Sequence, residues 1–86
     1  MIINGGIVTY NPDIEKLKKN LSRIAGQLWK LVIADNGSKN IEDIKRLAAA
    51  FENVSVILNY ENFGIARALN QIMKWSSNNG GDWTIT

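Results

Sequence analysis

Three short polar segments carry the residues of this 86-residue chain whose chemistry suits ligand binding, and each follows a run of aliphatic residues. The segments are Thr9–Pro12, Asp35–Lys39 and Asn59–Gly64. Tyr10 offers a ring that could stack on a base. The Asp35 carboxylate could accept hydrogen bonds from a nucleobase imide or a ribose hydroxyl, and Gly37 would let the backbone approach such a ligand closely.

Each segment also has a purely structural interpretation. Asn11 and Pro12 are typical of a helix start, as N-cap and first helical residue. Asp35–Ser38 has the composition of an Asx turn between a strand and a helix. Arg67 could face either solvent or the site. Asn70, expected in mid-helix, needs a reason such as holding a loop by hydrogen bonds.

The residue types that are missing restrict the chemistry of this chain. It has no Cys and no His, which removes thiolate metal sites, disulfides and the commonest general base. Catalysis would have to use carboxylates, hydroxyls or a metal bound by oxygen. Neither a G-x-G-x-x-G nor a G-x-x-x-x-G-K-[ST] motif occurs, which argues against dinucleotide oxidoreductases and P-loop enzymes. The net charge of +2 gives no reason to expect nucleic acid as a partner.

The elements that must position these segments alternate between strands and helices. Apolar runs predict strands at Gly6–Thr9, Leu31–Ala34, Val54–Leu58 and Trp83–Thr86. Three helices lie between them: the first runs from Asn11 to about Gly26, and the second is capped by Asn40. The third opens at Gly64 and ends in a break at Ser76–Gly81. This β-α-β-α-β-α-β order predicts an α/β fold with a mostly parallel sheet, which binds ligands at the carboxyl ends of its strands.

Each predicted helix has one apolar face, given by residues spaced three or four apart. In the first helix this face consists of Ile14, Leu17, Leu21 and Ile24. In the second it consists of Ile41, Ile44, Leu47, Ala48 and Phe51. In the third it consists of Ile65, Leu69, Ile72 and Met73, which we expect to be buried against the sheet.

In their order and spacing, the three polar segments resemble glycosyltransferase family 2. The amino-terminal half of that family typically has a strand ending in V-T-Y-N, a strand ending in V-D-N-x-S, and the segment N-x-G-x-A-x-A-x-N. This chain has Val8–Asn11, Ile33–Ser38 and Asn62–Asn70 at those places. The resemblance implies a Rossmann-like half of a GT-A fold over residues 1–86. The Tyr-Asn-Pro variant looks most like the bacterial rhamnosyltransferase-like branch.

The resemblance implies that a nucleotide-diphosphate sugar binds at the carboxyl ends of the first strands. Tyr10 and Thr9 would line the base pocket, Asp35 would hydrogen-bond the base, and Asn62–Asn70 would lie beside the nucleotide. The candidate nucleotide-sugar-binding residues are Thr9, Tyr10, Asn11, Asp35, Asn36, Asn62, Gly64 and Arg67. The parent enzyme would transfer the sugar to a growing polysaccharide or a lipid-linked glycan.

Two departures from the family pattern limit this transfer of roles. Many relatives have a basic residue after the glycine of the third motif or an Arg before its last Asn, where this chain has Ile65 and Leu69. Arg67 is the remaining cation there. In the family the fourth strand leads into a D-x-D motif that binds Mg²⁺ or Mn²⁺. Asp82 precedes that strand, so we expect an inactive fragment, without catalytic or metal-binding residues, cut before the D-x-D motif.

Three alternatives to this interpretation stay open. A non-catalytic nucleotide-binding module would show nucleotide affinity and a stop codon after Thr86. An assembly module that folds only against a partner would be an obligate dimer without nucleotide affinity. A sugar nucleotidyltransferase normally has a Gly-rich basic loop after its first strand, which Tyr10–Pro12 does not match.

The sequence also suggests where the protein resides and how it associates. Its longest apolar runs have four to five residues, against about 20 for a membrane span. We see no signal peptide before the first strand. We therefore expect a cytoplasmic protein, with a parent that can lie at the inner face of the membrane as a peripheral enzyme. A cut parallel sheet exposes an unpaired edge, which predicts self-association through the Trp83 strand or the surface around Trp75.

Overall fold

Strands and helices alternate along the whole chain in a computed structural model that describes residues 3–80 and 83–85. The strands are β1 (Ile3–Thr9), β2 (Lys30–Asp35), β3 (Val54–Leu58) and β4 (Trp83–Ile85). The helices are α1 (Ile14–Ile24), the short 3-10 turn η1 (Ala25–Gln27), α2 (Ile41–Ala49) and α3 (Ile65–Asn78). The predicted β-α-β-α-β-α-β order is confirmed.

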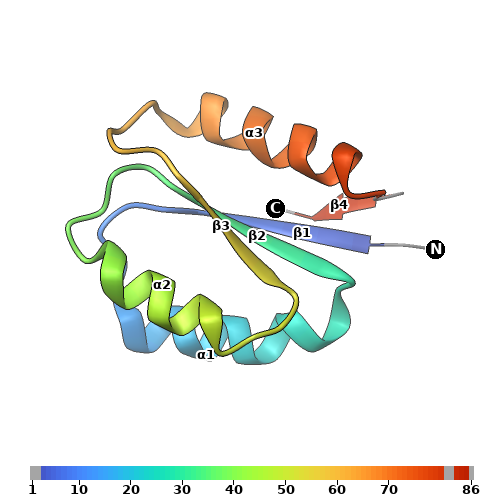
Figure 1. Cartoon of the computed structure of the whole chain (residues 1–86), viewed down its shortest axis with the longest axis horizontal. Coiled ribbons are helices and arrows are strands. Elements are labelled where there is room, and N and C mark those ends of the chain that lie inside the picture. Colours follow the sequence, from blue (N-terminus) through green and yellow to red (C-terminus); the bar gives the residue numbers. More distant parts are fainter. Residues whose placement is uncertain (1–2, 81–82, 86) are drawn as a thin grey trace.

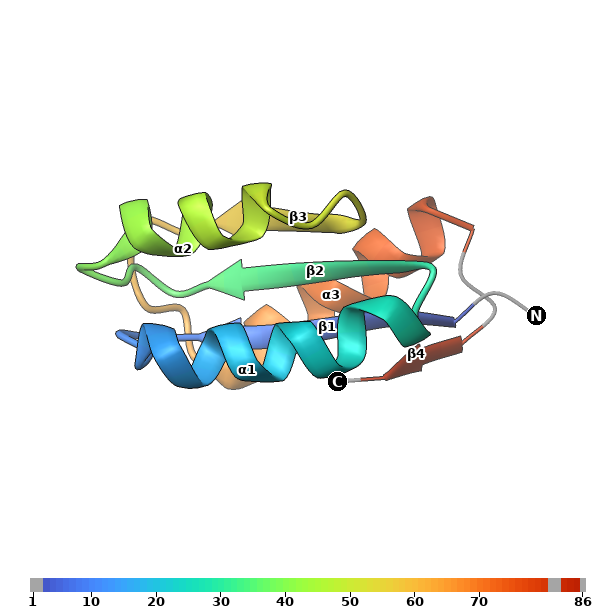
Figure 2. The same ribbon diagram turned by 90° about the horizontal axis from the view of Figure 1, so that it is seen from below.

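The strands form one parallel sheet in the order β3-β2-β1-β4. Helices α1 and α2 cover one face of the sheet, and α3 covers the other (Figure 1). On the first face, α1 lies along β1 and α2 lies along β3 (Figure 2). In the register of the sheet, Thr9 is opposite Asp35, and Asp35 is opposite Leu58. The ends of β1, β2 and β3 are therefore level with one another at the carboxyl edge of the sheet.

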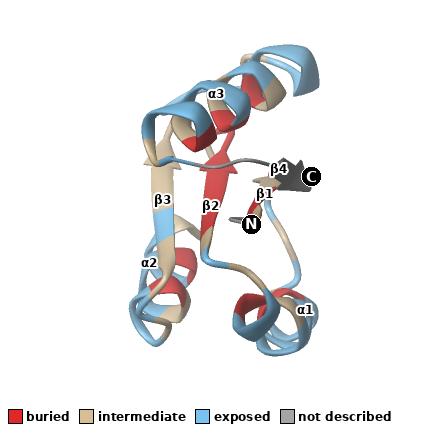
Figure 3. Ribbon diagram, turned by 90° about the vertical axis from the view of Figure 1, so that its right-hand side faces the viewer, coloured by how far each residue is buried: buried red, intermediate tan, exposed pale blue. Residues whose placement is uncertain are grey.

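Two hydrophobic cores lie on the two faces of β2. Alternate residues of a strand point to opposite faces, and β2 is buried over almost its whole length (Figure 3). Leu31 and Ile33 pack with α1 and α2, whereas Val32 and Ala34 pack with α3. This burial on both faces explains why the β2 sequence is an uninterrupted apolar run. The predicted apolar faces of α1 and α2 are confirmed.

The predicted start of the first helix is wrong. Helix α1 begins at Ile14, and its N-cap is Asp13, whose Oδ1 accepts hydrogen bonds from the backbone N–H groups of Glu15 and Lys16 at 3.0 and 3.2 Å. Asn11 lies before the helix with a positive φ of 47°. The first strand is also longer than predicted, because it begins at Ile3 and not at Gly6.

The predicted buried face of the third helix is correct only in part. Ala68, Ile72 and Ser76 face the sheet, while Ile65 and Met73 are 68% and 54% exposed. The reason is the close approach of α3 to the sheet, which places small residues at the contact. A Cβ atom on Gly6 would overlap Cγ2 of Ile72 and lie 2.9 Å from its Cγ1 and Cδ1.

The predicted break at Ser76–Gly81 begins later than expected, because α3 continues to Asn78 and the turn follows at Asn79 and Gly80. Ser76 is buried, and its hydroxyl accepts a hydrogen bond from Nδ2 of Asn4 at 3.2 Å. Tertiary contact therefore stabilises a polar residue in the last turns of the helix. Gly81, Asp82 and Thr86, for which we also had expectations, lie outside the described residues.

Candidate functional site

The three loops that follow β1, β2 and β3 meet at the carboxyl edge of the sheet, at the left of Figure 1. Two backbone hydrogen bonds extend the sheet into these loops. The N–H of Asn36 donates to the carbonyl of Thr9 at 2.9 Å, and the N–H of Asn59 donates to the carbonyl of Asp35 at 2.9 Å. The structure thus brings together the three polar segments that the sequence singles out.

Asp35 is the centre of this edge and is only 1% exposed. Its Oδ1 accepts hydrogen bonds from the hydroxyls of Thr9 and Ser38 at 2.7 and 2.5 Å. Its Oδ2 accepts from the backbone N–H groups of Gly37 and Ser38 at 3.2 and 2.9 Å. A carboxylate has about four acceptor positions, so the protein itself occupies them all. A base can bind to Asp35 only by replacing a donor, and the two hydroxyls are the donors that can rotate away.

Asn11 joins the loop after β1 to the turn after β2. Its backbone N–H donates to Oγ of Ser38 at 2.7 Å, and its Oδ1 accepts from the N–H of Lys39 at 2.8 Å. Nδ2 of Asn40 donates to the carbonyl of Pro12 at 2.9 Å. Asn11 is thus a link between loops and not the cap of α1, and Asn40 precedes α2 without making a side-chain cap. This link leaves the ring of the preceding Tyr10 56% exposed at the edge of the sheet.

Gly37 allows the turn after β2 to contact the loop after β3. Its φ is +83°, and a Cβ atom there would lie 3.0–3.2 Å from the backbone of Glu61. A cavity of about 80 Å³ lies at this contact, which is smaller than the roughly 300 Å³ of ordinary ligand pockets. It is lined by Asp35, Gly37, Ser38, Ile41, Leu58, Asn59 and Tyr60. A nucleotide would therefore have to lie on the open surface of this edge.

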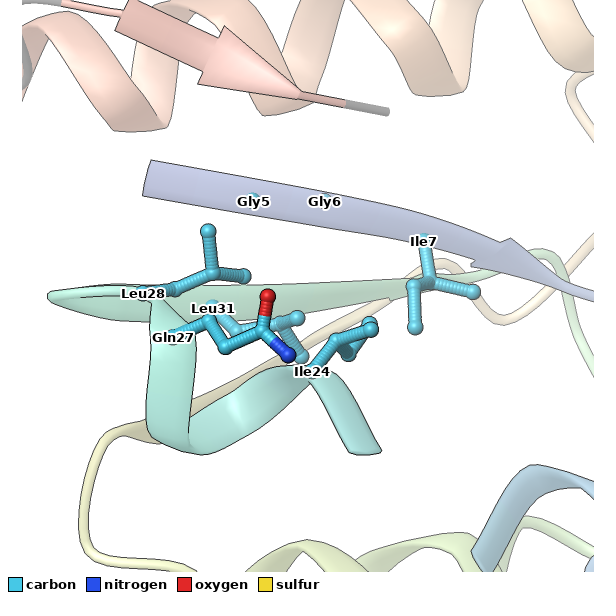
Figure 4. Close-up of a pocket in the computed structure, with 7 residues that line it drawn as sticks. All are labelled: Gly5, Gly6, Ile7, Ile24, Gln27, Leu28 and Leu31. Carbon is cyan, nitrogen blue, oxygen red and sulfur yellow. The ribbon is translucent and has the colours of Figure 1, made fainter. Parts of the chain in front are cut away.

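A larger cavity of about 390 Å³ lies between β1 and the end of α1 (Figure 4). Its lining contains no charged side chain, and Gln27 contributes the polar group seen there. It contains none of the residues that the sequence predicts to bind a nucleotide. Its size alone does not make it the better site, because a phosphorylated ligand needs polar groups that converge on it.

The remaining candidates surround the start of α3. Oδ1 of Asn62 accepts a hydrogen bond from the N–H of Gly64 at 2.8 Å. Nδ2 of the buried Asn36 donates to the carbonyl of Gly64 at 3.4 Å. The guanidinium of Arg67 lies 4.6 Å from the centre of the Phe63 ring, which is a cation–π contact. Arg67 is exposed, so its side chain can reach a ligand above this loop.

Sequence reasoning missed one polar pair, Asn59 and Gln71. Nδ2 of Asn59 donates to Oε1 of Gln71 at 2.7 Å, and Nε2 of Gln71 donates to Oδ1 of Asn59 at 2.8 Å. We expected Asn70 to hold a loop in this way, but Asn70 is exposed and the next residue has that role. The available signal was the position of Asn59, which directly follows β3 in the same way as Asn36 directly follows β2.

The described part of the chain does not fit a metal ion. It contains no group of three or more His, Cys, Asp or Glu residues that could hold one. Both oxygens of Asp35 are already used by protein donors. Within the described ranges there is also no helix of the length and apolar character that a membrane crossing requires.

Comparison with known protein families identifies the family of this chain. The family model described as "Glycosyl transferase family 2" matches residues 6–86. This range contains all eight candidate residues and the three loops of the carboxyl edge. No curated protein and no solved structure matches the chain.

Proposed function

Because this chain belongs to glycosyl transferase family 2, we propose that its carboxyl edge binds the nucleotide-diphosphate sugar that serves as donor in the sugar transfer typical of the family. The observation that carries this proposal is the convergence of three strand ends on the buried carboxylate of Asp35. In a parallel sheet this is the edge at which nucleotides bind.

The candidate residues take different roles in this proposal. The exposed ring of Tyr10 stacks on the base. A base N–H takes the place of the Thr9 or Ser38 hydroxyl at Asp35, where a donor is already accommodated. The diphosphate then lies toward the start of α3, where Arg67 supplies a positive charge.

The edge is organised before any ligand arrives, which favours binding. Asn11, Asn36 and Asn62 hold the loops by hydrogen bonds to backbone groups. The entropy lost by ordering these loops on donor binding is therefore small, and it subtracts little from the free energy of binding. Gly64 allows the sharp turn into α3 with a φ of +85°.

We propose that this chain binds a donor without transferring its sugar. Family 2 enzymes typically use a divalent ion to stabilise the charge of the departing diphosphate. For the parent enzyme we expect this ion to be Mg²⁺ or Mn²⁺. The described residues do not fit such an ion, so we assign no catalytic step to them. We further propose that the chain is the donor half of a longer enzyme, peripheral to the inner face of the membrane. Its acceptor would be a polysaccharide or a lipid-linked glycan, and we propose that it belongs to the rhamnosyltransferase-like branch.

A non-catalytic nucleotide-binding module is the second candidate, and the absence of a metal-binding cluster from the described residues favours it. The two candidates agree on nucleotide binding but differ in what happens when the remainder of a transferase is supplied. If the chain is a donor half, adding a separately expressed carboxyl-terminal half of a family 2 enzyme restores sugar transfer. A module of its own would bind the nucleotide and stay inactive.

Calorimetric titration with UDP, dTDP, GDP and ADP tests the proposed site. We expect one of these diphosphates to bind with a dissociation constant below about 1 mM. Tyr10→Ala should weaken that binding about tenfold, since stacking of one base on an aromatic ring contributes about 1–3 kcal/mol. Tyr60→Ala is the matched control, because this ring is 88% exposed in the neighbouring loop.

Two results would count against the proposal. If none of the four diphosphates binds, this edge is not a nucleotide site. If Tyr60→Ala weakens binding and Tyr10→Ala does not, the base lies on the loop after β3 and the stacking role of Tyr10 is wrong.

A further inference from the structure

Four polar groups next to the proposed site form a continuous chain of hydrogen bonds, which we call the relay. They are the side-chain amides of Gln71, Asn59 and Asn36 and the backbone carbonyl of Gly64. Nε2 of Gln71 donates to Oδ1 of Asn59 at 2.8 Å, and Nδ2 of Asn59 donates to Oδ1 of Asn36 at 3.3 Å. Nδ2 of Asn36 donates in turn to the carbonyl of Gly64 at 3.4 Å. Asn36 and Asn59 are 2% and 6% exposed, so water does not easily replace these partners.

The relay has a fixed direction. The carbonyl of Gly64 can only accept, so Asn36 must present its NH₂ group there and its oxygen to Asn59. Asn59 must then present its NH₂ group to Asn36, which leaves its oxygen for Gln71. The Asn59 NH₂ group also donates to Oε1 of Gln71 at 2.7 Å, which closes a reciprocal pair. Each amide orientation is therefore set by its neighbour.

This relay connects the two halves of the proposed site. At one end, Asn36 is the residue next to Asp35, and the backbone N–H of Asn59 donates to the Asp35 carbonyl at 2.9 Å. At the other end, Gly64 is the N-cap residue that directly precedes α3. Base and diphosphate can be bound together only if the Asp35 turn and the start of α3 keep a set separation.

We propose that Asn59 and Gln71 are positioning residues for donor binding: their reciprocal amide pair orients Asn36, which holds the Asp35 turn against the start of α3. This inference rests on the proposed function. Neither residue contacts the donor, and both act through Asn36.

The test compares Gln71→Glu with Asn70→Asp, since both variants add one negative charge to neighbouring positions of α3. Asn70 is exposed, whereas Gln71 belongs to the relay. A carboxylate at position 71 would repel Oδ1 of Asn59, and turning Asn59 over would break its bond to Asn36. We expect Gln71→Glu to weaken binding of the diphosphate that the wild-type chain prefers about tenfold relative to Asn70→Asp, the effect of about one unsatisfied buried polar group.

Two further variants separate positioning from general stability. Gln71→Met removes the amide without adding a charge. If Gln71→Glu does not fold, Gln71→Met takes its place in the test, and it should weaken binding to the same extent. The exchanged pair Asn59→Gln with Gln71→Asn keeps the summed side-chain length and both amides, and it should restore affinity that Gln71→Asn alone loses. All titrations are made well below the unfolding transition of each variant, so that a lower stability alone leaves the affinity unchanged.

Each possible result either supports or overturns the positioning role of Asn59 and Gln71. Equal affinities for Gln71→Glu and Asn70→Asp overturn it, as does an exchanged pair no better than Gln71→Asn. If the wild-type chain binds none of the diphosphates, the proposed function fails, and ¹⁵N spectra of the ligand-free variants decide the inference. Shifted backbone signals of Ser38 and Gly64 in Gln71→Glu, but not in Asn70→Asp, then support the relay, and unshifted signals overturn it.

Discussion

Removing the hydroxyl of Ser38 should destabilise the protein because that group serves two partners. It donates to Oδ1 of Asp35 at 2.5 Å and accepts from the backbone N–H of Asn11 at 2.7 Å. Ser38 is 6% exposed, and alanine leaves almost no additional cavity. Thr9→Val is the matched comparison, since it removes the other hydroxyl that donates to the same oxygen while keeping the side-chain shape.

The magnitude follows from the bonds that are lost. A hydrogen bond to a charged group contributes about 1.5–3 kcal/mol, which is the expected cost of Thr9→Val. Ser38→Ala loses a bond of this kind and also leaves the N–H of Asn11 without its acceptor, so it should cost about 1 kcal/mol more. The double variant leaves Oδ1 of Asp35 without a donor, and its cost should exceed the sum of the single costs by at least about 1 kcal/mol.

Urea unfolding followed by circular dichroism measures these differences. The slope of the unfolding free energy against urea should stay constant, while the midpoint falls. For a domain of this size, 1 kcal/mol corresponds to about 4–8 °C in melting temperature. A cost near zero for both single variants, or a double variant no worse than the sum, would refute the assignment of Asp35 as a carboxylate whose acceptor positions are all filled by its own loops.

Three further predictions concern the fold around the site. Gly6→Ala should cost about 1–3 kcal/mol in the same urea assay because its Cβ overlaps Ile72, and Ile72→Ala should remove most of that added cost in the double variant. Gly37→Ala should cost about 1–3 kcal/mol, since φ is +83° and the backbone of Glu61 is 3.0 Å away; a melting temperature equal to the wild type would contradict it. Among the described residues β4 is an edge strand of the sheet, and we propose that it pairs with a second copy of the chain; sedimentation at rising concentration measures this association, and a strict monomer would count against it.

The strands could be predicted well because a strand that is buried on both faces of a parallel sheet has an uninterrupted run of apolar residues. β2 shows this best, since Leu31 to Ala34 are completely buried and uninterrupted by polar residues. The face of α3 was predicted less well. Counting large apolar residues selects Ile65 and Met73, whereas close packing against Gly6 places Ala68 and Ser76 at the contact.

The three loops that carry the candidate residues could be predicted to meet at one edge of the sheet, but what those residues contact could not be predicted. Asn11 has the residue type of an N-cap, and local pattern does not reveal that its partner is the backbone of Lys39, 28 positions away. The pairing of Asn59 with Gln71 likewise depends on how α3 returns over the sheet. A hydrogen bond between distant segments leaves no periodicity in the sequence, so polar residues are easier to locate than to pair.

The candidate residues fall into two groups, which differ in burial and in whether their side chains are hydrogen-bonded to other parts of the carboxyl edge. Thr9, Asp35 and Asn36 are buried, and their side chains are bonded to other parts of the edge. Tyr10 and Arg67 are exposed, the latter against the ring of Phe63, and their side chains can contact a ligand. In the proposed function a base would meet a framework whose loops are already joined, so most of its binding energy would have to come from the exposed ring of Tyr10 and from exchange of a donor at Asp35. This is why substitution of the buried residues should lower stability and affinity together, whereas substitution of Tyr10 should lower affinity alone.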